Sequence, residues 1–147
     1  MKRQAFVILT TLSFLLMLAA TSVNAQSNLR LKVNVPFEFS VRDKLFPAGE
    51  YTVRSRAQGF LLIESVGLRA AQVFRTSATQ AGATRNQSSL VFNRYGDQYF
   101  LSAIWTAGRS TGFGVRKPDA EKGLIRARHE SAKSASEGQT VSIPAHP

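Results

Sequence analysis

The chain lacks cysteine, and this absence excludes both disulfide bonds and thiol chemistry. Because none of the 147 residues is a cysteine, no disulfide can form even in an oxidising compartment, and stability must come from packing and backbone pairing. A thiol nucleophile is excluded with it. The absence favours the periplasm or the bacterial exterior over a small secreted module built on disulfides.

Residues that carry acid–base and metal chemistry are also scarce. The chain has two histidines, His129 and His146, and nine acidic residues. The histidines lack the spacing of a metal-binding pair, and five acids of the central region are isolated in sequence: Glu38, Asp43, Glu50, Glu64 and Asp97. No glycine-rich phosphate loop is present. We therefore predict that the protein is not an enzyme, with no catalytic residue, no metal site and no cofactor.

Long hydrophobic runs are missing after the first 25 residues. Lys2 and Arg3 precede an apolar run of about sixteen residues, and Val23 and Ala25 occupy the small-residue positions of a signal-peptidase site. The run is short for a membrane span of about 20 residues. We predict a signal peptide over residues 1–25, a periplasmic or secreted location after cleavage near Ala25, and no transmembrane segment in the mature chain.

Positive charge is present in excess. The formal charge is +10, and loss of Lys2 and Arg3 with the signal peptide leaves 10 − 2 = +8. Thirteen of the 19 basic residues are arginines, which suit bidentate contact with carboxylates and phosphates. The expected partner is an anionic glycan or another anionic envelope polymer, with no specific nucleic acid. Because the arginines are scattered, simple solubility is the competing interpretation.

The dominant pattern is a period of two. In Leu29–Val41, LRLKVNVPFEFSV, apolar residues alternate with polar residues or proline, which predicts a strand with one buried face. Pro36 cannot donate to a strand ladder, so it indicates an edge strand or a bend where one strand becomes two. Phe60–Ile63 is apolar on both faces and predicts a central strand covered on both sides. Thr76–Ser89 is small and polar and predicts a long exposed loop.

These signals predict an all-β fold, a six- to seven-stranded antiparallel sandwich or small barrel with a C-terminal surface helix. A hairpin is expected in LVFNRYGDQYFLSAIW, with its turn at Tyr95, Gly96 and Asp97. The predicted boundaries are a β-domain over 26–116, a helix over 117–133 and a disordered tail over 134–147.

Three segments resemble the signatures of a family of small exported β-rich proteins from environmental bacteria: VPFEFSV, FPAGEYTV and LVFNRYGDQYFLSAIW. The resemblance covers about residues 33–105 and implies no particular activity. Members of the family usually have glycine at the position of Arg42. LFPAGEY is also similar to the turns of Greek-key sandwiches, which implies that the Tyr51 hydroxyl returns to a nearby backbone group as a structural corner.

Ligand-binding candidates come from the basic and aromatic residues of the predicted strands. We single out Arg54, Arg56, Arg94, Tyr95 and Tyr99. Aromatic faces beside arginines can stack on sugars or bases. Core packing and cross-strand pairing are the alternative for the aromatic residues, above all for Phe92, Phe100 and Trp105.

The sequence favours a non-enzymatic exported β-domain with a binding or structural role in the cell envelope, docking on anionic polymers. Two alternatives from other classes are an outer-membrane β-barrel and a hydrolase whose site is not visible in sequence. Neither a specific ligand nor an oligomeric state follows from the residues.

Overall fold

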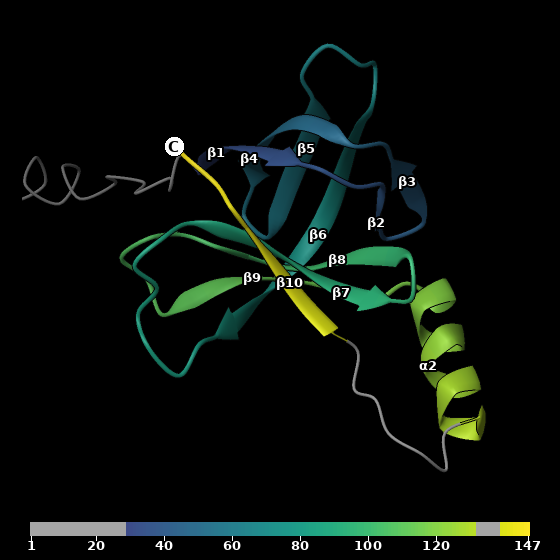
Figure 1. Cartoon of the computed structure of the whole chain (residues 1–147). Coiled ribbons are helices and arrows are strands. Elements are labelled where there is room, and N and C mark those ends of the chain that lie inside the picture. Colours follow the sequence, from purple (N-terminus) through teal and green to yellow (C-terminus); the bar gives the residue numbers. More distant parts are fainter. Residues whose placement is uncertain (1–28, 132–138) are drawn as a thin grey trace, which may run out of the picture.

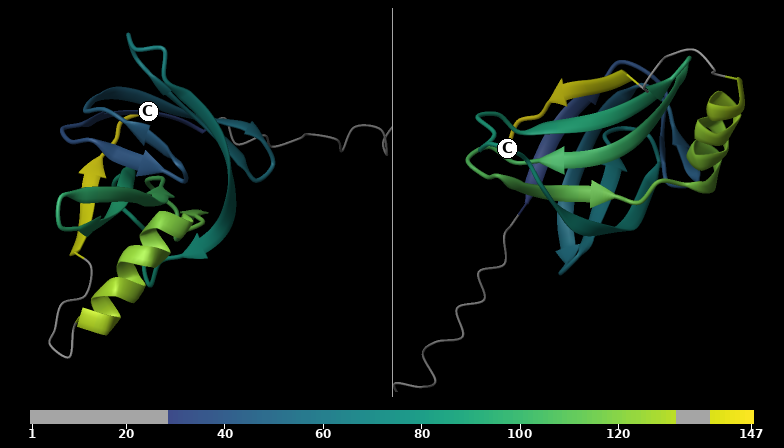
Figure 2. Two further views of the ribbon diagram at one scale, coloured as in Figure 1. Left: turned by 90° about the vertical axis from the view of Figure 1, so that its right-hand side faces the viewer. Right: turned by 90° about the horizontal axis from the view of Figure 1, so that it is seen from below.

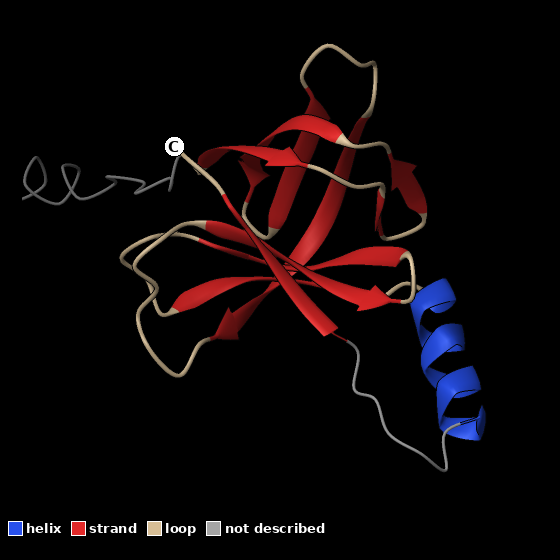
Figure 3. Cartoon of the chain, viewed as in Figure 1, coloured by secondary structure: helices blue, strands red, loops and turns tan. Residues whose placement is uncertain are grey.

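The computed structural model describes residues 29–131 and 139–147. Within these ranges the chain forms ten strands and one helix, and strands predominate (Figure 3). The strands are β1 (Arg30–Val35), β2 (Phe39–Val41), β3 (Lys44–Phe46), β4 (Gly49–Ala57), β5 (Phe60–Ser65), β6 (Ala71–Gln80), β7 (Ser89–Tyr95), β8 (Gln98–Trp105), β9 (Thr111–Val115) and β10 (Gln139–Pro144). The helix is α2 (Asp119–Ser131). The predicted signal peptide lies outside the described residues.

The strands form one sheet in the order β1-β4-β5-β6-β9-β8-β2-β3, with β7 on β8 and β10 on β7. All pairs are antiparallel except β2 with β8. Strand β6 joins two halves of the sheet: residues 71–75 pair with β5 and residues 76–80 pair with β9. In Figure 1, β1, β4 and β5 lie above β7, β8 and β9, and β6 runs through both groups.

The all-β class is confirmed, but the predicted number of six to seven strands and the small-barrel alternative are wrong. Ten strands are present among the described residues, and the sheet is mixed and open. Strands β1 and β10 are not paired; Lys32 of β1 forms an isolated bridge to His146, two residues after β10, in which the two residues exchange backbone hydrogen bonds of 2.6 and 2.9 Å. Short strands such as β2 and β3, three residues each, leave too little periodicity to be counted from sequence.

The alternating segment Leu29–Val41 lines the core, as its pattern predicts. Leu31, Val33 and Val35 are buried, and the residues between them are exposed. Pro36 follows the end of β1, so the alternating segment bends there and continues as β2. The core brings together apolar side chains from most of the strands, among them Phe39, Phe46, Phe74, Leu90, Phe92 and Ile104.

Tyr51 is the corner residue that the resemblance implies. Its side chain is fully buried, and its hydroxyl donates a hydrogen bond to the carbonyl of Pro47. Burial raises the pKa of Tyr51. The ring lies edge-on to Phe39 at 5.0 Å and to Phe46 at 5.8 Å. One side chain therefore ties the turn before β4 to the aromatic core.

Two loop predictions are wrong for the same reason. The predicted loop 76–89 begins instead with the end of β6, whose small polar residues pair with β9. The predicted disordered tail contains β10, which pairs with β7 over six residues. Both segments lack a strong apolar pattern but find a free strand edge, and backbone pairing does not require apolar side chains. The part of the predicted tail before Gln139 lies outside the described residues.

Strand β5 is central, between β4 and β6, but it is not covered along both faces. Leu61 and Ile63 face the core, and on the other face Leu62 is only 4% exposed whereas Phe60 is 42% exposed. The predicted helix exists as Asp119–Ser131 and stands at one end of the sheet (Figure 2). Over 29–131 and 139–147, no helix combines the length and apolarity needed to cross a membrane.

Candidate functional site

A pocket forms where two strands share one edge of β8. Strand β7 pairs along β8 from Tyr95–Gln98 to Ser89–Trp105 and occupies one edge completely. Strands β2 and β9 must therefore share the other edge, where β2 pairs at Phe100 and β9 at Ala103 and Ile104. Each chain segment then turns away, β2 into its turn with β3 and β9 into α2. Residues of the β2–β3 turn and of the segment that joins β9 to α2 line a pocket of about 190 Å³.

Charged side chains make up almost the whole wall of this cationic pocket. Its lining consists of Arg42, Asp43, Arg116, Lys117, Pro118, Asp119 and Lys122. Four positive and two negative side chains give a formal charge of 4 − 2 = +2. The wall contains no aromatic residue, and Pro118 is its one apolar member. Such a lining suits a charged or hydroxylated ligand rather than an apolar one.

Arg42 occupies its place in an unusual backbone conformation. It is the first of the two residues that link β2 and β3, and its φ is 55°. Among the described residues it is the one non-glycine residue with positive φ. Type II′ hairpin turns have positive φ at this first position and favour glycine there. The left-handed region disfavours a residue with a Cβ atom, so Arg42 is held at a conformational cost.

One of the two acids in the pocket is already matched. Lys122 donates to Asp119 over 2.6 Å, one turn apart on α2. The pKa of Asp119 is lowered by this hydrogen bond and by the charge of Lys122, with a smaller contribution from Arg116. Over the two described ranges, ion pairs join only Arg54 to Glu64 and Lys122 to Asp119. Arg42, Arg116 and Lys117 therefore have no carboxylate partner in the described part of the chain.

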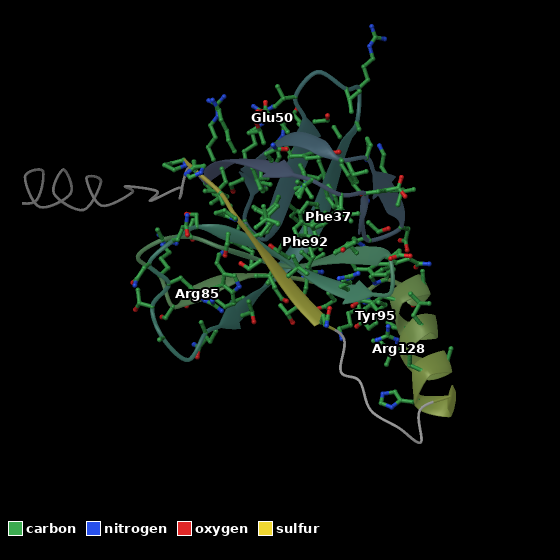
Figure 4. The ribbon with its side chains drawn as sticks, viewed as in Figure 1. Phe37, Glu50, Arg85, Phe92, Tyr95 and Arg128 are labelled. Atoms are coloured by element: carbon green, nitrogen blue, oxygen red, sulfur yellow. The ribbon has the colours of Figure 1, made fainter. Side chains whose placement is uncertain are left out.

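Helix α2 is fixed to the sheet by a buried carboxylate. Glu121 is 1% exposed and accepts hydrogen bonds from Asn93 Nδ2 at 2.8 Å and from the Tyr95 hydroxyl at 3.1 Å. Burial, with the charge and hydrogen bond of Glu121, raises the pKa of Tyr95 to about 12. Arg128 lies 5.4 Å from the centre of the Tyr95 ring, and both labels stand beside α2 in Figure 4. These contacts fix the helix that carries Asp119 and Lys122.

The structure divides the residues singled out from the sequence into two groups. Arg94, Tyr95 and Tyr99 lie together at the β7–β8 hairpin. Tyr99 stacks on Phe37 with ring centres 3.9 Å apart, and Arg94 lies 5.5 Å from the Tyr99 ring. The rings of both tyrosines are thus engaged in contacts within the protein.

The second group lies on β4. Arg54 pairs with Glu64 on the neighbouring strand β5, and Arg56 is exposed near the end of β4. Strand β4 pairs with β1 and β5, not with the hairpin strands β7 and β8. None of the five singled-out residues lines the cationic pocket. Their ligand-binding role stays a prediction.

Sequence reasoning missed Arg42, Arg116, Lys117 and Lys122 as a group, although each was visible. Arg42 and Arg116 lie 74 positions apart and come together only because β2 and β9 meet the same edge of β8. The available signal was local: Arg-Asp in a two-residue turn and RKPD at a strand–helix junction. In the described ranges, no three histidine or acidic residues are grouped to hold a metal ion.

Comparison with known proteins adds no family to this picture. No family model, no curated protein and no solved structure matches the chain.

Proposed function

We propose that the protein is a non-enzymatic, exported β-domain that binds anionic polymers of the cell envelope, and that the cationic pocket is its point of contact. The observation that carries the proposal is the group Arg42, Arg116 and Lys117, three cations in one pocket without a carboxylate partner among the described residues. Arginine forks match carboxylate, sulfate and phosphate oxygens in bidentate geometry.

The backbone at Arg42 supports the same conclusion. A solvated surface arginine that serves only solubility needs no particular backbone conformation. Here the side chain that lines the pocket stands on a left-handed residue, at φ 55°. Strained residues of this kind concentrate at functional sites because the surrounding structure holds them there. The excess charge of +8 on the mature chain would then add long-range attraction to a local site.

The test is retention on a sulfated-glycan column across a salt gradient. We expect Arg116→Glu to elute at lower salt than wild type, because it reverses a cation inside the pocket. Binding that neutralises several anionic groups has a steep salt dependence, with about 0.7 to 0.9 in the log–log slope for each group. Loss of one contact should lower that slope.

Arg56→Glu is the matched control. It makes the same charge change on an exposed strand residue outside the pocket. A larger loss for Arg56→Glu would move the contact to β4, where two of the five residues singled out from the sequence lie. Equal losses for the two variants would leave bulk charge as the cause, and elution of wild type at physiological salt would contradict polymer binding altogether. Unchanged melting temperatures would show that both variants are folded.

A further inference from the structure

Asp43 is the one acidic residue in the pocket without an ion-pair partner among the described residues, and a site for a simple anion does not need it. It is the second residue of the β2–β3 turn and follows Arg42 directly. In the part of the chain that the structure describes, no basic group is close enough to form an ion pair with it, whereas Asp119 is paired with Lys122. A bare phosphate or sulfate in this pocket would meet an unmatched carboxylate and be repelled by it.

A carboxylate accepts hydrogen bonds and donates none. Asp43 therefore favours a ligand that brings hydrogen-bond donors, while Arg42, Arg116 and Lys117 favour one that brings negative charge. Hydroxyl groups next to an acid group meet both requirements in one molecule. The carboxylate of Asp43 would accept from the hydroxyls, and the cations would bind the acid group.

The size of the pocket agrees with such a ligand. A volume of about 190 Å³ corresponds to about six water molecules at ~30 Å³ each, which is more than a single oxyanion requires. The charged lining, with Pro118 as its one apolar residue, offers partners to hydroxyl groups and little to an apolar body.

We propose that the cationic pocket binds an anionic sugar unit. Arg42, Arg116 and Lys117 bind the acid group of the sugar, and Asp43 accepts a hydrogen bond from one of its ring hydroxyls. This inference rests on the proposed function and narrows it, because it assigns the ligand class of the same site. The recognised unit is a sugar that carries a phosphate or carboxylate group. A polymer of such units would present the same group repeatedly.

The experiment compares three small probes on the whole mature protein by NMR titration: inorganic phosphate, glucose and glucose 6-phosphate. For wild type we expect glucose 6-phosphate to bind about tenfold more tightly than inorganic phosphate, the equivalent of one additional hydrogen bond to a charged group. Glucose alone should bind more weakly than either, since it brings no charge. The shifted amide resonances should belong to the β2–β3 turn and to residues 116–122.

Asp43→Ala should change the affinities for inorganic phosphate and glucose 6-phosphate in opposite directions. Removal of the carboxylate should tighten inorganic phosphate by about fivefold, as a repulsive charge is lost. The advantage of glucose 6-phosphate over phosphate should fall toward one, as the hydroxyl loses its acceptor. Asp97→Ala, an exposed aspartate at the β7–β8 turn outside the pocket, is the matched control and should keep the wild-type ratio.

The outcomes separate this inference from the proposed function. Equal affinities for phosphate and glucose 6-phosphate in wild type would overturn the sugar assignment and leave a site for simple anions. A ratio unchanged in Asp43→Ala would overturn the role of Asp43 and, with it, the assignment. Binding of neither anionic probe by wild type would overturn the sugar assignment, whereas the proposed function fails separately, if the sulfated-glycan column does not retain wild type above physiological salt.

Discussion

An Arg42→Gly variant is expected to be more stable than wild type and to bind anionic polymers less well. The left-handed backbone at φ 55° costs a residue with a Cβ atom about 1 to 2 kcal/mol. Glycine adopts this region freely but gains about 0.5 to 1 kcal/mol more unfolded-state entropy than other residues. The difference is a net stabilisation of about 0.5 to 1 kcal/mol.

Two measurements check this prediction. Thermal unfolding should show a melting temperature about 2 to 8 °C higher, from the usual proportion between stability and melting temperature in small domains. The salt needed for elution from a sulfated-glycan column should fall, because one of the three unpaired cations is gone. Asp43→Gly provides the stability control: Asp43 has no positive φ, so glycine there should destabilise by about 0.5 to 1 kcal/mol.

A loss of more than about 1 kcal/mol in Arg42→Gly would refute the reasoning, since it would show that the Arg42 side chain holds the fold together. Unchanged elution would equally remove Arg42 from the binding site. The combination of higher stability with weaker binding is the one result that a purely structural arginine cannot give. If the basic residues served only solubility, the loss of any one positive charge would lower the eluting salt concentration equally. Arg56→Gly, which removes one positive charge outside the pocket, tests this alternative.

Three further predictions concern the sheet and α2. Glu121→Leu should cost about 2 to 4 kcal/mol, because it leaves two partly buried donors without an acceptor, whereas Glu121→Gln should cost less; urea unfolding measures both. Val35→Glu should prevent folding while Asn34→Glu is tolerated, since Val35 is fully buried and Asn34 is exposed; circular dichroism decides, and equal melting temperatures would refute the core assignment. Burial raises the pKa of Tyr95 to about 12 from 10.0. The stability that the protonated Tyr95 hydroxyl contributes is therefore complete below pH 10 and is lost as pH rises toward 12. Tyr95→Phe should lose less stability than wild type over this pH range, as urea unfolding measures.

Features specified by neighbouring residues could be predicted from the sequence. The alternation of Leu31, Val33 and Val35 identifies the buried face because successive strand residues point to opposite sides of a sheet. The β7–β8 hairpin follows from a turn at Gly96, whose φ is 63°, between two strand-forming arms. In each case the determining interactions lie within a few positions along the chain.

Features specified by distant pairing could not be predicted in this way. Strand β10 carries only two strand-forming apolar residues, Val141 and Ile143, and becomes a strand because the edge of β7 offers it backbone partners, with Ala145 buried in the core just after it. The buried Glu121 is equally invisible, since an acid in the first turn of a helix is expected on electrostatic grounds alone. Its acceptor role depends on Asn93 and Tyr95, which are more than 25 positions away.

The cationic pocket lies on turns and a strand–helix junction, and this placement fits a polymer better than a small soluble ligand. Turns can exchange residues without disturbing the sheet, so a cation at Arg42 costs only its local backbone strain. Under the proposed function, an exposed site with about +2 of formal charge should hold a single anionic unit weakly, because water and salt screen it. A polymer of linked units should bind more tightly than one unit, because a unit that leaves the pocket is replaced by its neighbour, which is present at high effective concentration. The proposed site is therefore expected to show both weak contacts with one unit and firm retention of the polymer.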